Sequence, residues 1–558
     1  MTSLQCFNWL PFSFPRRIQE GVSNCLLCPG CRGGCFRLYQ TGLYPPHQLL
    51  KLQHINGRKP QFAYGAAAVE GLERSKMFCN PNARKNVMNE FERQLEELFT
   101  QVKLMIKNGN KEEAIHILQA NYETVREQLD DGFKGIEQAA ILDTLALGYM
   151  CVGDLKIVGH LLKMLKEIIF CVEDDQPLLD SILVHMGSMF SAIGKFEDAA
   201  LVYERCLKIL EKEFGDDNPF LITPLLGRAK VFRATGRSTK AIIIYHRVIK
   251  ILEWKRGLES EELVVPLFSL GDLCISEGKT TEAESCFSRI LCIYQKLYGE
   301  NDGRVGIAMS SLAHAKCAKG EINEAINLYK TGLWVINESK YLNSDDDRLE
   351  KMRVDLAELL HATGREQESR EVLQECLMIN EKYKGIEHPN SVGHLLNLAT
   401  SYSHSKNYIE AERLLRICLR ILSARVDRDD QLITVPMLHL AVIMYLLNRD
   451  EEAENFALEV VRLREKSYGK ESLPVGEALD CLVSIQTRLG RDDSDILAKL
   501  KRILIIQERE IGYESEDSLT TLKKVLFYLN KLGLKDELLP LQRRLQLLKA
   551  KFKHSIPA

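Results

Sequence analysis

The chain has 558 residues, a formal net charge of −3 and a pI near 6.5. This balance excludes an overall basic field of the kind that recruits nucleic acid, and a charged fraction of 27% fits an ordinary soluble surface. No run of about 18 apolar residues occurs, so a transmembrane helix is not expected.

The N-terminal segment, residues 1–75, is poor in acids and bears arginines. Between Met1 and Val69 the only acidic residue is Glu20, against seven Arg or Lys. Such a start resembles an organelle transit peptide, and the Met-Thr-Ser opening is similar to plastid ones. We therefore expect a chloroplast targeting segment, followed by a linker at 76–88. Because only three serines fall between Met1 and Val69, two alternatives stay open: a mitochondrial peptide, or an untargeted disordered arm on a cytoplasmic protein.

The same segment holds four closely spaced cysteines, Cys25-x2-Cys28-x2-Cys31-x3-Cys35. The spacing is similar to the bacterial ferredoxin run, in which cysteine thiolates hold an iron–sulfur cluster. However, Phe36 stands where that run has proline, and no second cysteine run follows. We interpret the four cysteines as part of a cysteine-rich leader without a metal; an iron–sulfur or zinc site is the alternative.

A short segment recurs through the rest of the chain. One copy reads Gly194-Lys-Phe-Glu-Asp-Ala199, and its leading glycine, which we call the anchor, returns every 42 residues at Gly236, Gly278 and Gly320. The anchor position is also occupied by Gly109, Gly153, Gly364, Lys406, Asn448, Gly490 and Gly533. Eleven units therefore cover residues 89–548, and this period is typical of one long solenoid of stacked units.

Each unit is predicted to be a pair of helices. Apolar residues recur at helical spacing before the anchor, as in 395–402, and after it, as in 411–422. The anchor lies in the turn between the two helices, where a positive φ is needed that Gly, and next best Asn, adopts at low cost. Lys406 is therefore expected to form the most strained of these turns.

Small residues recur at two positions around the anchor. They allow two helix backbones to approach closely, while larger residues such as Tyr149 and Phe190, four before the anchor, fill the space beside them. Cysteines stand twelve after three anchors, and we expect all these residues to be buried. The residues seven before the anchor are Ala146, Gly187, Ala229, Gly271, Ala313, Ala357, Ala399 and Ala441; those five after it include Ala114, Ala199, Ala241, Ala283, Ala325, Ala411 and Ala453; the cysteines are Cys206, Cys376 and Cys418.

This pattern of small, aromatic, turn and alanine positions resembles the tetratricopeptide repeat. The 42-residue period and the loops after the second helices, such as 214–219 and 385–389, are similar to the kinesin-light-chain branch of that family. The resemblance implies an all-α, right-handed α-solenoid of about eleven helix-turn-helix repeats. It also implies a non-enzymatic protein, without cofactor or small-molecule substrate, that binds a peptide or helix of a partner protein in a concave groove lined by the first helices. No phosphate-binding glycine loop, His-Glu-x-x-His or nucleophile elbow occurs in the sequence.

The resemblance places the residue nine before each anchor in that groove. Kinesin light chains carry asparagines there, and only Asn397 matches them. Arg228, one position further on, interrupts a line of Leu and Met; we expect it to reach the rim of the groove, and holding an anionic group is the alternative. The candidate groove residues are Thr144, His185, Gly227, Arg228, Ser269, Ser311, Asp355, Asn397 and His439.

The last units depart from the pattern. Asp495 and Leu538 replace the small residue after the anchor, and the chain beyond Leu541 carries Arg and Lys but no acid. We expect a polar last helix that caps the solenoid, followed by a basic tail at 549–558; a basic contact surface is the alternative.

The leading functional interpretation is a scaffold that resembles plant plastid-targeted repeat proteins and serves assembly or maintenance of an organellar protein complex. A cytosolic, kinesin-light-chain-like cargo or cytoskeletal adaptor is the first alternative. An RNA-binding helical-repeat protein is the second, although it would need recurrent coding side chains and a basic groove. A cluster carrier built on Cys25 to Cys35 is the third.

Overall fold

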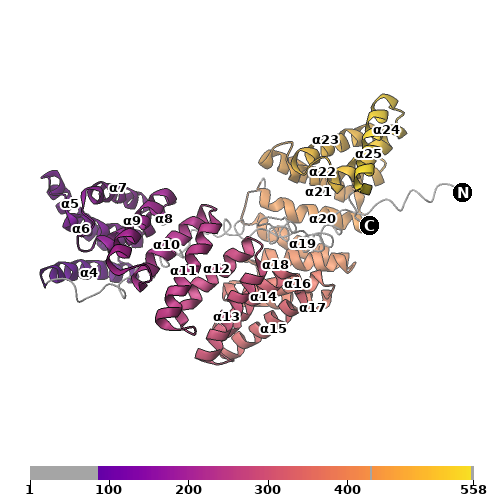
Figure 1. The fold of residues 1–558 in the computed structure, drawn as a ribbon. Coiled ribbons are helices and arrows are strands. Elements are labelled where there is room, and N and C mark those ends of the chain that lie inside the picture. The colour runs from indigo at the N-terminus through magenta and orange to yellow at the C-terminus, as the bar shows by residue number, and fades with distance from the viewer. Residues whose placement is uncertain (1–85, 428–429, 555–558) are drawn as a thin grey trace. The chain divides into compact units, whose positions relative to one another are not determined.

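The computed structural model describes residues 86–427 and 430–554. Within these ranges the chain forms twenty-two α-helices, three short 3-10 helices and no strands (Figure 1), which confirms the all-helical prediction. The described residues divide into two compact units, with residues 86–342 in the first and residues from 343 onward in the second. The cysteines at 25–35 lie outside the described residues. None of the described helices is both long enough and apolar enough to cross a bilayer.

The first unit contains six helix pairs, α4 to α15. Each pair has a first helix before its anchor and a second helix after it, as the repeat pattern predicts. The first helices are α4 (Asn86–Lys107), α6 (Ile136–Val152), α8 (Leu179–Ala192), α10 (Ile222–Ala234), α12 (Val264–Ser276) and α14 (Gly303–Lys319). The second helices are α5 (Lys111–Asp130), α7 (Leu155–Cys171), α9 (Phe196–Phe214), α11 (Ser238–Arg256), α13 (Thr280–Tyr298) and α15 (Ile322–Ser339).

The second unit contains five further pairs, α16 to α25. Its first helices are α16 (Asp347–Ala362), α18 (Ser391–His404), α20 (Thr434–Leu446), α22 (Leu473–Arg488) and α24 (Glu516–Lys531). Its second helices are α17 (Glu366–Lys384), α19 (Tyr408–Ser423), α21 (Asp450–Tyr468), α23 (Asp493–Glu510) and α25 (Lys535–His554). The 3-10 helices η3 (Pro219–Leu221), η4 (Glu261–Leu263) and η5 (Gln431–Ile433) lead into α10, α12 and α20.

The outermost helices extend beyond their predicted bounds. Helix α4 begins at Asn86, before the predicted start at 89, and α25 continues to His554, into the segment expected to be a basic tail. The eleven pairs match the eleven predicted repeats. Their union into one continuous solenoid stays a prediction.

The anchors form the turns within the pairs. All eleven have a positive φ, between 61° and 92°, as the glycine pattern predicts. Lys406 adopts φ 61°, a region that costs an L-residue with a Cβ roughly 1–2 kcal/mol. Asn448 has the same φ, but its short polar side chain tolerates this conformation better.

Each pair is closed by a close approach of its two helix backbones. The seven alanines five after the anchor are all 0% exposed. In the pair α16–α17, Ser369 replaces this alanine, and its hydroxyl donates to the backbone oxygen of Ala357 at 2.7 Å. Because Ala357 stands seven before the same anchor, this bond shows that the two small positions face each other across the pair.

Tyr203 links one pair to the next. Its ring, on α9, is 4% exposed and packs on Gly187 of its own pair and on Gly227 of the following pair. A Cβ at Gly187 would lie 2.6 Å from Cζ of that ring, and a Cβ at Gly227 would also overlap it. Both glycines therefore make room for one aromatic side chain.

The ten cysteines among the described residues are all free thiols. Cys206, Cys376 and Cys418 are buried, as their positions predict. Burial raises the pKa of Cys376 to about 12, so its thiol stays protonated at neutral pH. These cysteines serve as small apolar residues and not as nucleophiles.

We expect Gly187→Ala to destabilise the first unit by about 1–3 kcal/mol, because the new methyl group would overlap the buried Tyr203 ring. Gly159→Ala in α7 is the matched control: a Cβ there meets no atom within 4 Å. Alanine also favours a helix interior by about 0.5–1 kcal/mol over glycine, so the control should be slightly stabilised. Urea unfolding of both variants checks this; an equal response would contradict the packing described.

Candidate functional site

Some neighbouring first helices pack directly on one another within each unit. In the first unit α6 packs against both α4 and α8, and in the second unit α20 packs against α22. Among the described residues, no second helix packs to a similar extent on the next second helix. We call each unit's row of first helices its first-helix wall.

Most first helices have one face that is only partly covered, because their partners and neighbours pack on the other faces. On α12, which packs on α11, α13 and α14, this face carries Val265, Phe268, Asp272 and Ile275, at the spacing of one helical stripe. On α10, Lys230 is exposed at the position that corresponds to Asp272 of α12. We call the positions thirteen, ten, six and three before each anchor the wall stripe.

Five of the candidate groove residues lie beside the wall stripe. They stand one residue after its second position, which is about 100° around the helix. All five are half-buried: Ser269, Ser311, Asp355, Asn397 and His439.

Two other candidates have packing roles. Thr144 is 8% exposed, in a helix on which α4 packs, and its hydroxyl donates to the backbone oxygen of Ala140 at 3.0 Å. Gly227 is small because the Tyr203 ring packs on it.

The centre of the wall stripe, six residues before the anchor, is not among the residues predicted from the sequence. The residues there share no chemistry, so no recurrent letter marks the position. A usable signal is the absence of an apolar preference on an otherwise apolar helix. The residues are Lys103, Leu147, Ser188, Lys230, Asp272, His314, Glu358, Thr400, Val442, Ser484 and Phe527.

Polar pairs join neighbouring first helices in the first unit. Nδ1 of His185 on α8 lies 2.6 Å from a carboxylate oxygen of Asp143 on α6. Burial raises the pKa of Asp143, and the charge and hydrogen bond of His185 oppose that shift. Arg233 pairs with Asp272 between α10 and α12. His185 therefore contributes to the cohesion of the wall.

Arg228 reaches from α10 towards the rim. Its guanidinium lies 3.2 Å from Glu204 on α9 and stacks over the Phe232 ring, 5.3 Å from the centroid. The side chain is 26% exposed. A carboxylate of the protein itself therefore neutralises its charge.

Two residues of the second unit's first-helix wall, His439 and Glu358, have shifted pKa values that leave their side chains uncharged or largely uncharged at neutral pH. Burial, helped by the charge of Arg464, lowers the pKa of His439 to about 4. Burial, helped by Asp355, raises the pKa of Glu358 to about 8. His439 is therefore neutral at pH 7, and Glu358 is largely protonated.

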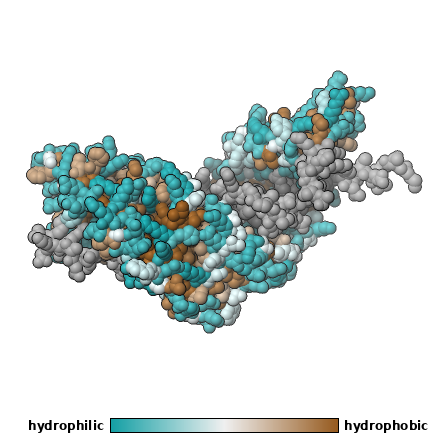
Figure 2. Space-filling model, viewed as in Figure 1, coloured by the Kyte–Doolittle hydropathy of each residue, from teal (hydrophilic) through white to brown (hydrophobic). Residues whose placement is uncertain are grey.

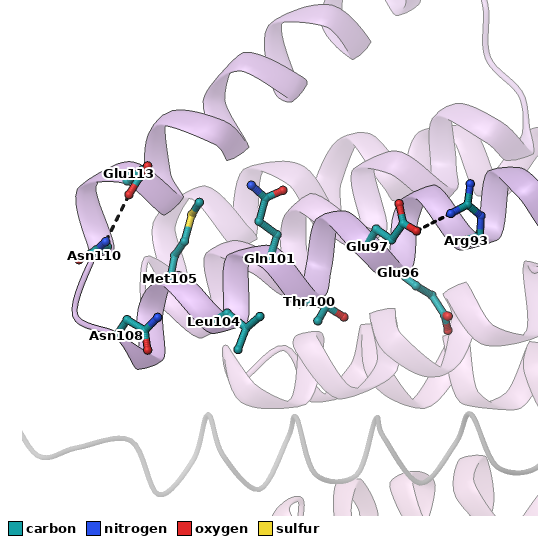
Figure 3. Close-up of a pocket in the computed structure, with 10 residues that line it drawn as sticks. All are labelled: Arg93, Glu96, Glu97, Thr100, Gln101, Leu104, Met105, Asn108, Asn110 and Glu113. Atoms are coloured by element: carbon teal, nitrogen blue, oxygen red, sulfur yellow. Dashed lines mark hydrogen bonds and ion pairs between the residues drawn. The ribbon is translucent and has the colours of Figure 1, made fainter.

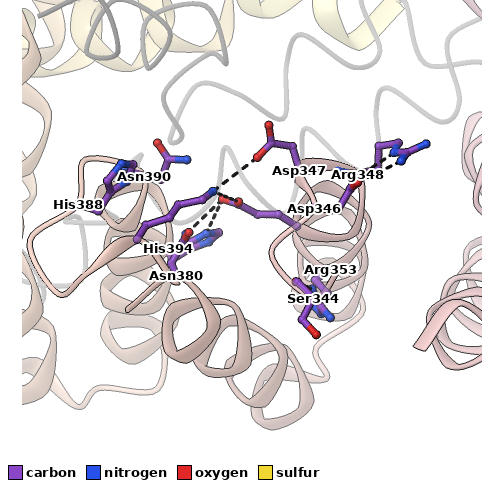
Figure 4. A network of polar contacts seen from close by, with 11 residues as sticks. Ser344, Asp346, Asp347, Arg348, Arg353, Asn380, His388, Asn390 and His394 are labelled. Carbon is purple, nitrogen blue, oxygen red and sulfur yellow. Dashed lines mark hydrogen bonds and ion pairs between the residues drawn. The ribbon is translucent and has the colours of Figure 1, made fainter. Parts of the chain in front are cut away.

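Glu350 lies at the centre of a polar network formed by three helices of the second unit (Figure 4). Its carboxylate accepts from Asn380 Nδ2 at 3.3 Å and Lys384 Nζ at 3.2 Å, and it lies 2.9 Å from His394 Nε2. Burial alone would raise the pKa of Glu350, but its contacts with His394 and Lys384 outweigh burial and lower that pKa to about 2. The network ties α16, α17 and α18 together.

A groove of about 560 Å³ lies on the pair α4–α5 (Figure 3). Arg93 and Glu97 approach to 2.5 Å on its wall, and Asn110 donates to Glu113 at 3.3 Å. These polar groups pair with one another. They do not form the convergent set that recognises a small molecule.

Apolar side chains are exposed over the helices around α10 to α12 (Figure 2). The exposed fraction is 64% for Ile243 and 71% for Trp254 on α11, and 47% for Phe268 on α12. Phe268 belongs to the wall stripe, whereas the other two lie on a second helix. An exposed aromatic residue at such a position is the type of side chain that anchors protein interfaces.

Paired helices stacked through small residues, with an exposed stripe on the first helices, define a helical-repeat protein of the interaction-scaffold type. Its repeats are tetratricopeptide repeats: a family model of that description matches residues 177–253, 263–333 and 348–424, and a second model of the same description matches 437–473. The predicted family resemblance is thereby confirmed.

Solved structures similar to the chain include kinesin-light-chain-like repeat proteins. The TPR-like repeats of a Podospora anserina protein described as a kinesin light chain are 18% identical, with a TM-score of 0.34 over 38% of this chain and 99% of that one. BtubC (BKLC) from P. vanneervenii is 18% identical, with a TM-score of 0.36 over 42% and 92%. The apo form of RapI is 12% identical, with a TM-score of 0.42 over 67% and 98%. No curated protein matches the chain.

We expect the stability that Glu350 gives the second unit to be lost as the pH falls from about 4.5 towards 2. Its folded pKa lies below its ordinary value of 4.5, so the unfolded chain takes up the proton first and acid favours unfolding. Glu350→Gln should cost roughly 2–3 kcal/mol at pH 7 and progressively less below pH 4.5.

Urea unfolding between pH 7 and pH 3 measures this difference, and hydrogen exchange of α16 to α18 localises it. Glu371→Gln, at an exposed position of α17, is the matched control and should change little. A cost of Glu350→Gln that does not vary with pH would contradict the assignment.

Proposed function

We propose that the protein is a scaffold that holds an extended segment or a helix of a partner protein against the first-helix wall. The wall stripe carries this proposal: its centre, six residues before the anchor, is half-buried or exposed on most first helices, and α10, α12 and α24 each expose side chains along it. Because the repeats fold this surface in advance, binding requires little rearrangement of the scaffold.

Phe268 is the side chain best suited to anchor a partner. Its ring packs edge-on against Phe287, with centroids 5.8 Å apart, and remains 47% exposed. Because Phe287 already restricts the Phe268 ring, the ring loses little conformational freedom when a partner covers it. Asp272, one turn further along the stripe, is already paired with Arg233, so the surroundings favour an apolar side chain of the partner at this point.

An RNA ligand fits the wall stripe less well. At its centre the stripe carries Lys103 and Lys230 on two helices but Asp272 and Glu358 on others, so basic residues do not recur from helix to helix to follow a phosphate backbone.

We also propose that the scaffold works in a plastid, in the assembly or maintenance of a protein complex. The support is the acid-poor, arginine-bearing segment at 1–75 and its Met-Thr-Ser opening. A cytosolic adaptor similar to kinesin light chains is the alternative in which the wall has the same role in another compartment.

We expect Phe268→Ala to weaken partner binding by about tenfold or more, because removing an aromatic anchor leaves its contact unfilled. Proximity labelling with the full chain identifies the partners, and titration with the most strongly labelled one measures affinity. Trp254→Ala is the matched control, since it removes an exposed aromatic residue from a second helix. Equal losses in the two variants would contradict binding along the wall.

We expect a fluorescent fusion of residues 1–80 to enter plastids, and the mature full chain to begin downstream of Cys35. A fusion carrying Arg16→Glu and Arg17→Glu should stay outside, because these changes place acids in a segment that has almost none. Cytosolic retention of the unaltered fusion, with Met1 intact on the full chain, would reject the plastid and leave wall binding unaffected.

A further inference from the structure

We propose that His361, Glu366 and His404 form a binding site for a divalent transition metal ion of the zinc class. His361 lies in the last turn of α16, Glu366 is the first residue of α17, and His404 is the last residue of α18. One potential ligand atom from each of them lies within 4.8 Å of the other two. The site therefore joins three helix ends from two successive repeats of the second unit.

The repeat pattern does not explain why His361 and His404 lie close together. His361 stands three residues before its anchor, Gly364, and His404 stands two before Lys406. The two histidines thus occupy different phases of the repeat, so neither is a copy of the other. Their rings nevertheless lie with centroids 4.8 Å apart and planes at 52°.

The donor set fits zinc. Two imidazoles and one carboxylate form a known three-ligand set that leaves a fourth position for water or another group. Bonds of about 2.0–2.1 Å in a tetrahedral site place the ligand atoms roughly 3.3 Å apart, so these side chains need to close by up to about 1.5 Å. All three are half-buried at helix ends, where a rotamer change can supply that movement.

One ring nitrogen at the site lacks a hydrogen-bond partner. Nδ1 of His361 is buried and has no hydrogen-bond partner. Buried polar atoms are almost always paired, and an imidazole nitrogen is one of the commonest metal ligands. A metal ion bound at this nitrogen would supply the partner that the neighbouring side chains do not.

Arg370 carries a positive charge close to the proposed site, and this charge disfavours the binding of a metal cation. Its guanidinium lies 3.6 Å from Glu366, and it also contacts the hydroxyls of Ser401 and Ser405 at 3.4 and 3.3 Å. Its plane stacks over Tyr402, 5.5 Å from the ring centroid. With these other contacts, Glu366 can turn to a metal ion without leaving Arg370 unpaired. Removing the positive charge should nevertheless strengthen metal binding.

The test is calorimetric titration of the chelator-treated full chain with zinc chloride. We expect one bound ion that persists when Cys25, Cys28, Cys31 and Cys35 are all changed to serine, because those thiolates could bind zinc independently. X-ray absorption of this variant with four serines should show nitrogen and oxygen ligands.

Variants of the ligands test the assignment. Glu366→Gln and His404→Gln should each weaken binding of that ion by more than about tenfold, since even outer-shell changes at metal sites cost 10- to 100-fold. Arg370→Gln should tighten it several-fold. His246→Gln is the matched control: His246 lies 2.8 Å from Glu282 in a similar pair that has no third ligand.

Circular dichroism checks that each variant folds, and Glu366→Gln preserves the size of its side chain. The proposal is overturned if zinc binding disappears with the four cysteines. It is also overturned if both ligand variants bind zinc as the unaltered chain does, because the three residues would then be an ordinary polar cluster.

Discussion

The close approach of two helix backbones within each pair is the constraint on which the structure depends. The bond from Ser369 to the backbone of Ala357 spans this contact directly, and in seven other pairs an alanine with no exposed surface occupies the position of Ser369. A larger residue at either point would push the helices apart and expose the apolar faces that they bury together. Stacking the pairs then buries what a single pair cannot.

The fold could be predicted because its determinants are local and recur at fixed spacing. The anchors predict where the chain must reverse with a positive φ, and all eleven do, including Lys406, where the side chain makes that conformation costly. The two small positions predict which faces meet. Helix ends were less predictable, because α4 and α25 lie where the repeat pattern fades and no neighbouring copy fixes the boundary.

The candidate site could be predicted only to the level of a helix face. Ser269 and Asn397 lie beside the uncovered stripe because one residue of phase shifts a side chain by about 100°. Thr144 is buried in a helix on which α4 packs, and this contact depends on how helices stack and not on a recurrent letter. His361 and His404 belong to different repeats, and only the packing of α16 and α18 on the same helix, α17, brings their rings together.

The ring of Tyr203 has a consequence for how the first unit opens. Because it fills a gap between Gly187 on α8 and Gly227 on α10, melting of α10–α11 uncovers the Tyr203 ring, and melting of α8–α9 removes that ring from the surface of α10. This nearest-neighbour coupling makes residues 179–256 one cooperative block, with local unfolding events that span two repeats at a time. A ligand that clamps either pair would then protect both from proteolysis.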